Sequence, residues 1–310
     1  MILALCGGVG GSKMALGLYR VLPLNSLYIC VNTADDLDFW GLRVCPDLDT
    51  VMYTLAGLSR PDVGWGIDGD TFQARDMLAR YGAPDWFAVG DRDLATDVFR
   101  TDRLASGDTL TRLTEVMSRS LGVRADILPM TDDIVETRLL VDNRWLEFQE
   151  YFVRRGHRDP VEAVRYRGVE SARPTRGVLE AVRRADIIVI VNSNPVLSIL
   201  PALSMPDLRA ALAQSTCPRV AISPIVGGDA VTGPAGELMR LVGEESSCLG
   251  VARLYESVID GIVIDERDAD RASAIKALGM HVLITNTIMH TIEDRERAAS
   301  ETLTFARSLR

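Results

Sequence analysis

Short apolar runs alternate with amphipathic helical patterns at both ends of the chain. The runs that predict strands are Ile2–Cys6, Leu27–Val31, Ile187–Val191, Arg219–Ser223, Gly261–Ile264 and Val282–Thr285. Strands that alternate with helices in this way indicate a mostly parallel sheet with helices on both faces. We therefore expect an α/β fold with a three-layer, Rossmann-like arrangement.

The middle of the chain has a different pattern. Helical spacing predicts helices over Asp70–Tyr81 and Thr109–Leu121. Two strand-like runs, Val135–Val141 and Trp145–Val153, then flank Asp142-Asn143, a pair typical of two-residue hairpin turns. A further strand is expected over Tyr166–Val169.

No linker rich in proline, glycine or serine separates these parts. We therefore predict one α/β domain over residues 1–310, with a core formed by 1–60 and 180–310. An insertion of about 61–179, with helices and a β-hairpin, is expected to sit on that core.

Composition narrows the classes of partner. The formal charge is -9, with no basic face, which argues against nucleic acid as a partner. No apolar run approaches the roughly 20 residues that span a bilayer, so no membrane partner is expected. The five scattered cysteines favour reduced thiols and a cytoplasmic location.

A glycine-rich segment, Gly7–Lys13, connects the first strand to the first helix, predicted from about Lys13 to Val21. Its spacing fits neither the GxxxxGK[ST] phosphate loop nor the GxGxxG dinucleotide fingerprint. Glycine allows close approach of a ligand to the backbone, and a helix N-terminus favours an anion. A phosphate site is expected, with a tight turn without ligand as the alternative. The residues predicted to bind the nucleotide are Gly8, Gly10, Gly11 and Lys13.

An acidic segment, Asn32–Thr50, follows the second strand. One of Asp47 and Asp49 is expected to be the N-cap of a helix, which leaves the other carboxylate free. Carboxylates beside a phosphate site suit Mg²⁺, or they could orient a hydroxyl nucleophile. We predict a Mg²⁺ site at Asp35, Asp36 and Asp49.

Small polar residues also follow two later strands. Asn194, Ser223 and Gly227 lie just after apolar runs, where α/β sheets bind ligands, and are predicted to contact the nucleotide. Two further clusters, Gly90–Asp93 and Pro129–Asp133, fit a turn and a functional role equally well.

Taken together, these motifs resemble the 2-phospho-L-lactate transferase family (CofD or FbiA) of coenzyme F-420 biosynthesis, over residues 2 to about 297. The segments that carry the resemblance are Gly7–Lys13, Val31–Asp36, Pro46–Val51, Gly90–Thr96, Leu128–Asp133, Phe148–Phe152, Ser193–Pro195 and Ser223–Gly228.

The resemblance implies a Mg²⁺-dependent transferase. Such an enzyme moves a phospho-acid from its guanosine diphosphate ester to the ribityl hydroxyl of the deazaflavin FO, releasing GMP. Asp49 matches a family aspartate that contacts FO, and it is the predicted catalytic residue. The family's basic FO contact falls on Ala88 here. Either Arg92, the predicted FO contact, or another residue compensates, or FO is held differently.

The donor acid, whether phospholactate, phosphoenolpyruvate or phosphoglycerate, cannot be predicted from the sequence. A homodimer is expected, because dimers are the commonest soluble oligomers and the resemblance favours one. Two alternatives are a non-catalytic, nucleotide-binding regulator of related fold and a nicotinamide-dependent oxidoreductase. The broken dinucleotide fingerprint at Lys13 counts against the oxidoreductase.

Overall fold

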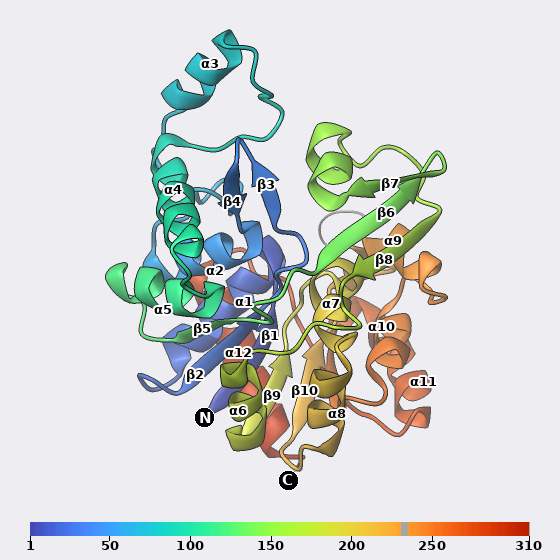
Figure 1. The fold of residues 1–310 in the computed structure, drawn as a ribbon. Coiled ribbons are helices and arrows are strands. Elements are labelled where there is room, and N and C mark those ends of the chain that lie inside the picture. Colours follow the sequence, from blue (N-terminus) through green and yellow to red (C-terminus); the bar gives the residue numbers. More distant parts are fainter. Residues whose placement is uncertain (231–234, 310) are drawn as a thin grey trace.

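A seven-stranded sheet, parallel throughout, forms the centre of the protein (Figure 1). The computed structural model describes residues 1–230 and 235–309. The strand order is β14-β13-β10-β9-β1-β2-β5. The strands are β1 (Ile2–Cys6), β2 (Leu27–Val31), β5 (Asp126–Pro129), β9 (Ile187–Ile190), β10 (Arg219–Ile222), β13 (Gly261–Asp265) and β14 (His281–Thr285). The predicted α/β class is confirmed.

Helices cover both faces of this sheet. One face packs against α1 (Gly8–Val21), α2 (Pro46–Ala56), α5 (Leu110–Ser120) and α12 (Ile292–Arg307). The other face packs against α6 (Arg176–Arg184), α7 (Leu200–Leu203), α8 (Pro206–Gln214), α9 (Ala235–Leu241), α10 (Cys248–Tyr255) and α11 (Ala272–Ala277). The three predicted layers are therefore present.

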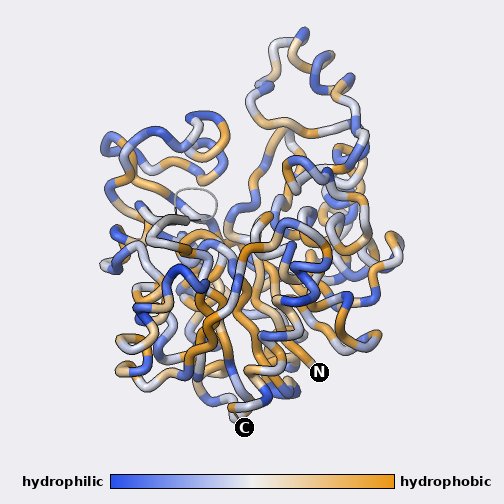
Figure 2. The backbone as a smooth tube through the Cα atoms, turned by 180° about the vertical axis from the view of Figure 1, so that it is seen from behind, coloured by the Kyte–Doolittle hydropathy of each residue, from blue (hydrophilic) through white to orange (hydrophobic). Residues whose placement is uncertain are grey.

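Strand β1 illustrates why the central strands consist of consecutive apolar residues. Leu3 and Leu5 belong to one hydrophobic core, whereas Ile2, Ala4 and Cys6 belong to the other. Successive side chains of a strand point to opposite faces, so a sheet covered on both faces requires apolar residues at every position. Hydrophobic residues accordingly concentrate along the sheet (Figure 2).

Two smaller structures rise beyond the carboxyl ends of the central strands (Figure 1). One contains the hairpin β3 (Leu37–Phe39) and β4 (Leu42–Val44), with α3 (Gln73–Arg80) and α4 (Asp91–Ala105). The other is an antiparallel sheet of β6 (Glu136–Val141), β7 (Arg144–Glu147) and β8 (Ala163–Arg167). A short pair, β11 (Ile225–Val226) and β12 (Asp229–Ala230), follows β10.

The predicted hairpin turn is confirmed. Asp142 and Asn143 have φ angles of 49° and 59°, as a two-residue turn with two left-handed residues requires. The second strand ends at Glu147, however, and the prediction that it continues to Val153 is wrong. Residues Glu150–Arg154 form a π-helix.

Three further differences concern element boundaries. Helix α1 begins at Gly8 rather than near Lys13, so most of the glycine-rich segment is its first turn. The N-cap of α2 is Cys45, so the prediction of an aspartate cap there is wrong. Strand β5 comes from within 61–179, yet it pairs with β2 in the central sheet.

Across residues 1–230 and 235–309, no single helix is long and apolar enough to cross a membrane. The helices Pro195–Leu203 and Pro206–Gln214 are long and apolar enough only when they are counted together, and they are bent by 85° relative to each other. Leu203, Leu208 and Leu212 of this pair are buried in the hydrophobic core.

Candidate active site

The main cavity lies at the carboxyl ends of the parallel strands and has a volume of about 650 Å³. Residues that follow four of these strands line it: Gly7 after β1, Asp35 after β2, Asn192 after β9 and Ser223 after β10. The two smaller structures described above also contribute to its wall. This is the edge at which open α/β sheets bind their ligands.

The first turn of α1 forms one wall of the main cavity. Gly8 and Gly10 line it, and Gly8 has a φ of 64°, a conformation that favours glycine. Amide groups of a first helical turn lack partners within the helix and attract anions. Gly11 lies instead in the interior, where a Cβ atom would come within 2.9 Å of Cys6 Sγ.

Lys13, one turn further along α1, also lines the main cavity. Burial and the nearby guanidinium of Arg295 lower the pKa of Lys13. Two neighbouring cations repel each other less when an anion binds between or beside them. The helix N-terminus and Lys13 together are suited to a diphosphate.

Two carboxylates, Asp35 and Asp47, face this wall. Asp47 accepts a hydrogen bond from Asn32 Nδ2 at 3.0 Å, and the Gly8 amide also bonds to it. Burial raises the pKa of Asp47 to about 6. Burial and the charge of Asp47 raise the pKa of Asp35 well above its usual range. Asp35 Oδ1 is buried without a hydrogen-bond partner.

The other two predicted metal ligands are bound to arginines. Asp36 lies 3.3 Å from Arg43 and accepts a hydrogen bond from Cys45 Sγ at 3.1 Å, and it does not line the main cavity. Asp49 lines the cavity but forms an ion pair with Arg100. Within the described residues, no group of three or more His, Cys, Asp or Glu side chains could hold a metal ion.

Arg100 lies at the centre of a buried polar network. Its guanidinium contacts Asp49, Asp97 at 2.8 Å and the carbonyl oxygen of Arg43 at 3.1 Å. Burial raises the pKa of Asp49, and the charge of Arg100 opposes this rise. Asp93 lies on the same helix as Asp97, and burial and the charge of Asp49 raise its pKa to about 7.

Aromatic side chains from two parts of the chain also line the main cavity, and together they are called its aromatic wall. Trp65, Trp86 and Phe87 precede α4, whereas Phe148 and Phe152 follow β7. Flat, apolar walls of this kind suit a planar ring system. Ala88 lines the cavity as well, whereas Arg92 does not; its guanidinium donates to the carbonyl oxygen of Asp68 at 3.2 Å.

Two of the three predicted nucleotide contacts at the later strands line the main cavity, and one does not. Asn194 and Ser223 line the main cavity. The Asn194 carboxamide oxygen accepts from the amides of Val196 and Leu197, and it therefore caps the following helical turn. Gly227 lies outside the cavity and donates its amide to Asp268 at 3.0 Å.

Several cavity residues were not predicted from the sequence as site residues. Asp47 was interpreted as a possible helix cap, and Asp93 belonged to a motif that fitted a turn equally well. Tyr53 and the aromatic wall carried no separate signal, because apolar and aromatic residues are usual in any core. Asn192 lies in the polar segment that follows a predicted strand, but only Asn194 of that segment was predicted as a contact; the buried carboxamide oxygen of Asn192 has no hydrogen-bond partner.

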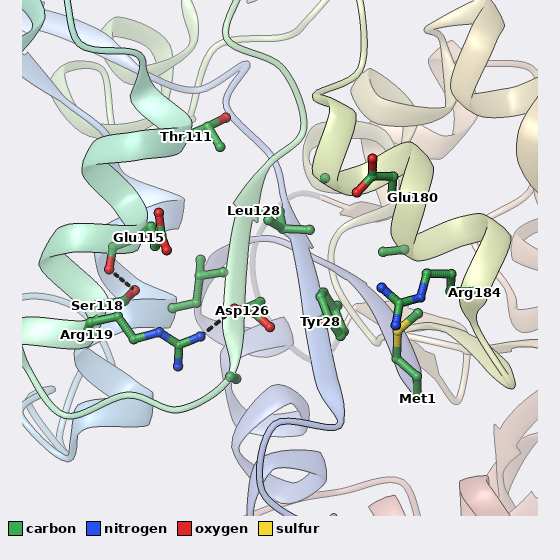
Figure 3. A pocket seen from close by; sticks show the side chains of 14 residues that line it. Met1, Tyr28, Thr111, Glu115, Ser118, Arg119, Asp126, Leu128, Glu180 and Arg184 are labelled. Carbon is green, nitrogen blue, oxygen red and sulfur yellow. Dashed lines mark hydrogen bonds and ion pairs between the residues drawn. The ribbon is translucent and has the colours of Figure 1, made fainter.

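A separate cavity of about 260 Å³ lies beside the edge strand β5, between α5 and α6 (Figure 3). Tyr28, Asp126, Leu128 and Arg184 line it, and Arg119 forms an ion pair with Asp126 at 2.5 Å. It contains none of the residues predicted to bind a substrate.

One sheet edge thus presents a helix N-terminus, a lysine, two carboxylates and several aromatic side chains, an arrangement suited to an α/β protein with a phosphorylated ligand and a planar one. The sequence model of the family "2-phospho-L-lactate transferase CofD" matches residues 2–298. The chain belongs to this family, and it is a CofD-type transferase of coenzyme F-420 biosynthesis.

Similar proteins share this length. A phosphoenolpyruvate transferase of Streptomyces coelicolor is 40% identical over 315 residues, covering 100% of this chain and 99% of that protein. A 2-phospho-L-lactate transferase of Methanocaldococcus jannaschii is 37% identical over 313 residues, covering 100% and 99%. The crystal structure of protein BH3568 from Bacillus halodurans has a TM-score of 0.63 at 19% identity, covering 99% and 98%, and shows the fold alone.

Proposed function

We propose that this transferase moves a phospho-acid from its guanosine diphosphate ester to the ribityl hydroxyl of FO. The hydroxyl oxygen forms a bond to the phosphorus that carries the acid. The bridging P–O bond of the diphosphate breaks, and GMP leaves with the electron pair. The observation that carries this proposal is the main cavity, which the first turn of α1, Lys13 and the aromatic side chains line together in a chain of the CofD family.

The nucleotide end is assigned to the wall formed by α1. Gly8, Gly10 and Lys13 would contact the diphosphate, with Asn194 and Ser223 beside the guanosine. Such transfers depend mainly on positioning and charge neutralisation, so no covalent intermediate is required. Gly11 lies behind this wall, beside Cys6 and Ser193, and Gly227 is bonded to Asp268 outside the cavity.

The deazaflavin end is assigned to the aromatic wall. Its rings offer a flat apolar surface for FO, and Asp49, fixed by Arg100, would accept a hydrogen bond from the ribityl hydroxyl. The exposed position of Arg92 makes it a poor substitute for the basic contact missing at Ala88. We infer that ring stacking replaces that contact here.

Mg²⁺ fits two carboxylates of this cavity. Asp35 and Asp47 would hold it, because both line the cavity and Asp35 Oδ1 is a buried oxygen without a partner. Oxygen ligands suit Mg²⁺, which usually shares its shell with water and substrate phosphate. Bound there, the ion would neutralise charge on the diphosphate. The ion pairs of Asp36 and Asp49 with arginines make these two less suitable ligands.

A donor competition assay tests the proposed function. The protein is incubated with FO and equimolar guanosine diphosphate esters of phosphoenolpyruvate, phospholactate and phosphoglycerate, with Mg²⁺ or with a chelator. Mass spectrometry of the deazaflavin product identifies the acid transferred, and GMP measures turnover. Product from one donor, absent with the chelator, is expected. Binding of FO without GMP release from any donor would overturn the transferase assignment.

The metal ligands can be tested without turnover. A ligand that binds only the folded state raises its stability by about 2.7 kcal/mol at one hundred times its Kd. We expect Mg²⁺ to raise the melting temperature of the wild type and of Asp36→Asn. Asp35→Asn should not respond, and an equal response would exclude Asp35 as a ligand.

Two further inferences concern the environment of the enzyme. The five cysteines are all free, which supports a reducing, cytoplasmic compartment. A homodimer remains a prediction from the family resemblance, and light scattering coupled to size-exclusion chromatography would measure it.

A further inference from the structure

Three carboxylates lie near one guanidinium beside the main cavity. Asp49 and Asp97 both bind Arg100, and Asp93 lies one helical turn before Asp97 on α4. Three ionised carboxylates with one arginine would leave an excess negative charge in a buried site, which is costly. The cluster is therefore suited to take up a proton.

Two of the three carboxylates line the main cavity, and Asp93 is the one of these two that is not bonded to Arg100. Asp97 is fully buried and does not line the main cavity. Asp49 lines it, but its Oδ1 is bound to Arg100. Asp93 lines the cavity, and its Oδ1 accepts a hydrogen bond from the Tyr53 hydroxyl at 2.8 Å. Among the described residues, no side-chain or backbone donor bonds to Asp93 Oδ2.

The surroundings of Asp93 hold it in one orientation. The Tyr53 hydroxyl also lies 2.7 Å from Thr96 Oγ1, so the phenol is itself fixed. The backbone amide of Asp93 donates to Asp70 Oδ2 at 3.1 Å. A catalytic base needs a fixed position within hydrogen-bond reach of the proton it accepts.

Asp93 also borders a second cavity. This cavity, of about 350 Å³, shares Trp65, Gly66, Ala88 and Asp93 with the main cavity and is otherwise lined by Gly90 and by residues within 60–72. Asp93 thus lies where the two cavities meet, and a proton accepted on one side can be passed to water on the other.

We propose that Asp93 is the base that accepts the proton of the acceptor hydroxyl, while Asp49 orients that hydroxyl. This inference rests on the proposed function. As the hydroxyl oxygen bonds to phosphorus, its proton moves to the Asp93 carboxylate and the departing GMP takes the P–O electron pair. Asp93 then returns the proton to water in the second cavity.

The test compares Asp93→Asn with Asp102→Asn, which removes an exposed carboxylate from the same helix. Asparagine keeps the shape but cannot accept the proton. The loss of a general base typically costs about 10²- to 10⁴-fold in rate. We expect a loss of that size in the kcat of Asp93→Asn, with the KM for FO changed by less than about threefold. Asp102→Asn should match the wild type.

A second variant separates catalysis from architecture. Asp93→Ala leaves a gap beside the second cavity, and added formate should restore part of its kcat, with no effect on Asp102→Asn. Wild-type kcat in Asp93→Asn, or a loss that formate does not restore, would overturn the inference while wild-type turnover still supports the transferase. A wild type without turnover would overturn both.

Discussion

Replacing Arg100 with methionine removes the only cation that contacts both Asp49 and Asp97 among the residues the structure describes. Its side chain is 2% exposed, so water cannot take its place. Removing one partner of a buried ion pair typically costs about 3–5 kcal/mol, because the other charge is left uncompensated. We expect a destabilisation of that size at neutral pH.

That free energy can be converted to a melting temperature. An unfolding entropy of about 2.1 cal/mol/K per residue gives about 0.65 kcal/mol/K for this chain. The expected fall in Tm is therefore about 5–8 °C for Arg100→Met, measured by circular dichroism at pH 7.5 with a chelator present.

The pH dependence of this loss has a definite sign. Burial already raises the pKa values of Asp49 and Asp97, and without Arg100 they rise further. When folding raises the pKa of a carboxyl, the folded protein loses stability as the pH rises above the carboxyl's unfolded-state pKa of about 3.9. The deficit of Arg100→Met should therefore be largest near pH 8 and shrink toward pH 4.

The matched control is Arg103→Met, on the same helix and one turn away. The Arg103 side chain is 50% exposed and pairs with Asp108 at the surface, an interaction worth about 0–1 kcal/mol. If the two variants melt within about 1 °C of each other, the buried network does not contribute as described.

Three further predictions address other parts of the site. Gly11→Ala should cost about 1–3 kcal/mol, because its Cβ would overlap Ser193 Oγ, and denaturant unfolding measures this loss. A variant as stable as the wild type would show that the neighbouring side chains move to accommodate the added methyl group. Asp35→Asn should raise Tm by a few degrees at pH 8 in chelator but not near pH 4, since burial raises the pKa of Asp35 and ionisation therefore destabilises the fold as the pH rises. A Tm difference that does not vary with pH would contradict this reasoning. Trp65→Ala should raise the KM for FO by about 2- to 10-fold, as expected for loss of an aromatic contact, whereas Trp145→Ala, outside the cavity, should not. Equal KM values would remove Trp65 from the deazaflavin wall.

Local patterns in the sequence were sufficient to predict the central strands. Ile2–Cys6 and Leu27–Val31 have the predicted bounds, because both faces are covered and every position is apolar. The Asp142-Asn143 turn was also predictable, since few residues tolerate two successive left-handed conformations.

The errors arose where side chains met distant partners. The strand predicted over Trp145–Val153 changes to a helix after Glu147, and Phe148 and Tyr151, three residues apart, are both buried, as helical spacing allows. Strand β5 is only four residues long and was not predicted, because its place depends on pairing with β2.

The site, too, could be predicted where it depends on local sequence patterns but not where it depends on contacts between distant residues. Positions after strands, such as Asp35 and Ser223, could be predicted to face a ligand because strand ends meet at one edge of a sheet. The pairing of Asp49 with Arg100 could not, since the two residues are 51 positions apart and only the packing of α4 on the β3–β4 hairpin brings them together.

The position of β1 inside the sheet, between β9 and β2, has a consequence during synthesis of the chain. β1 leaves the ribosome well before its neighbour β9, which begins at Ile187, the partner of Ile2. At about 5–20 residues per second, one edge of β1 waits roughly 10–40 s for that partner. Unpaired apolar edges promote aggregation, so we expect the yield of folded protein to depend on translation speed and on chaperones that hold nascent chains.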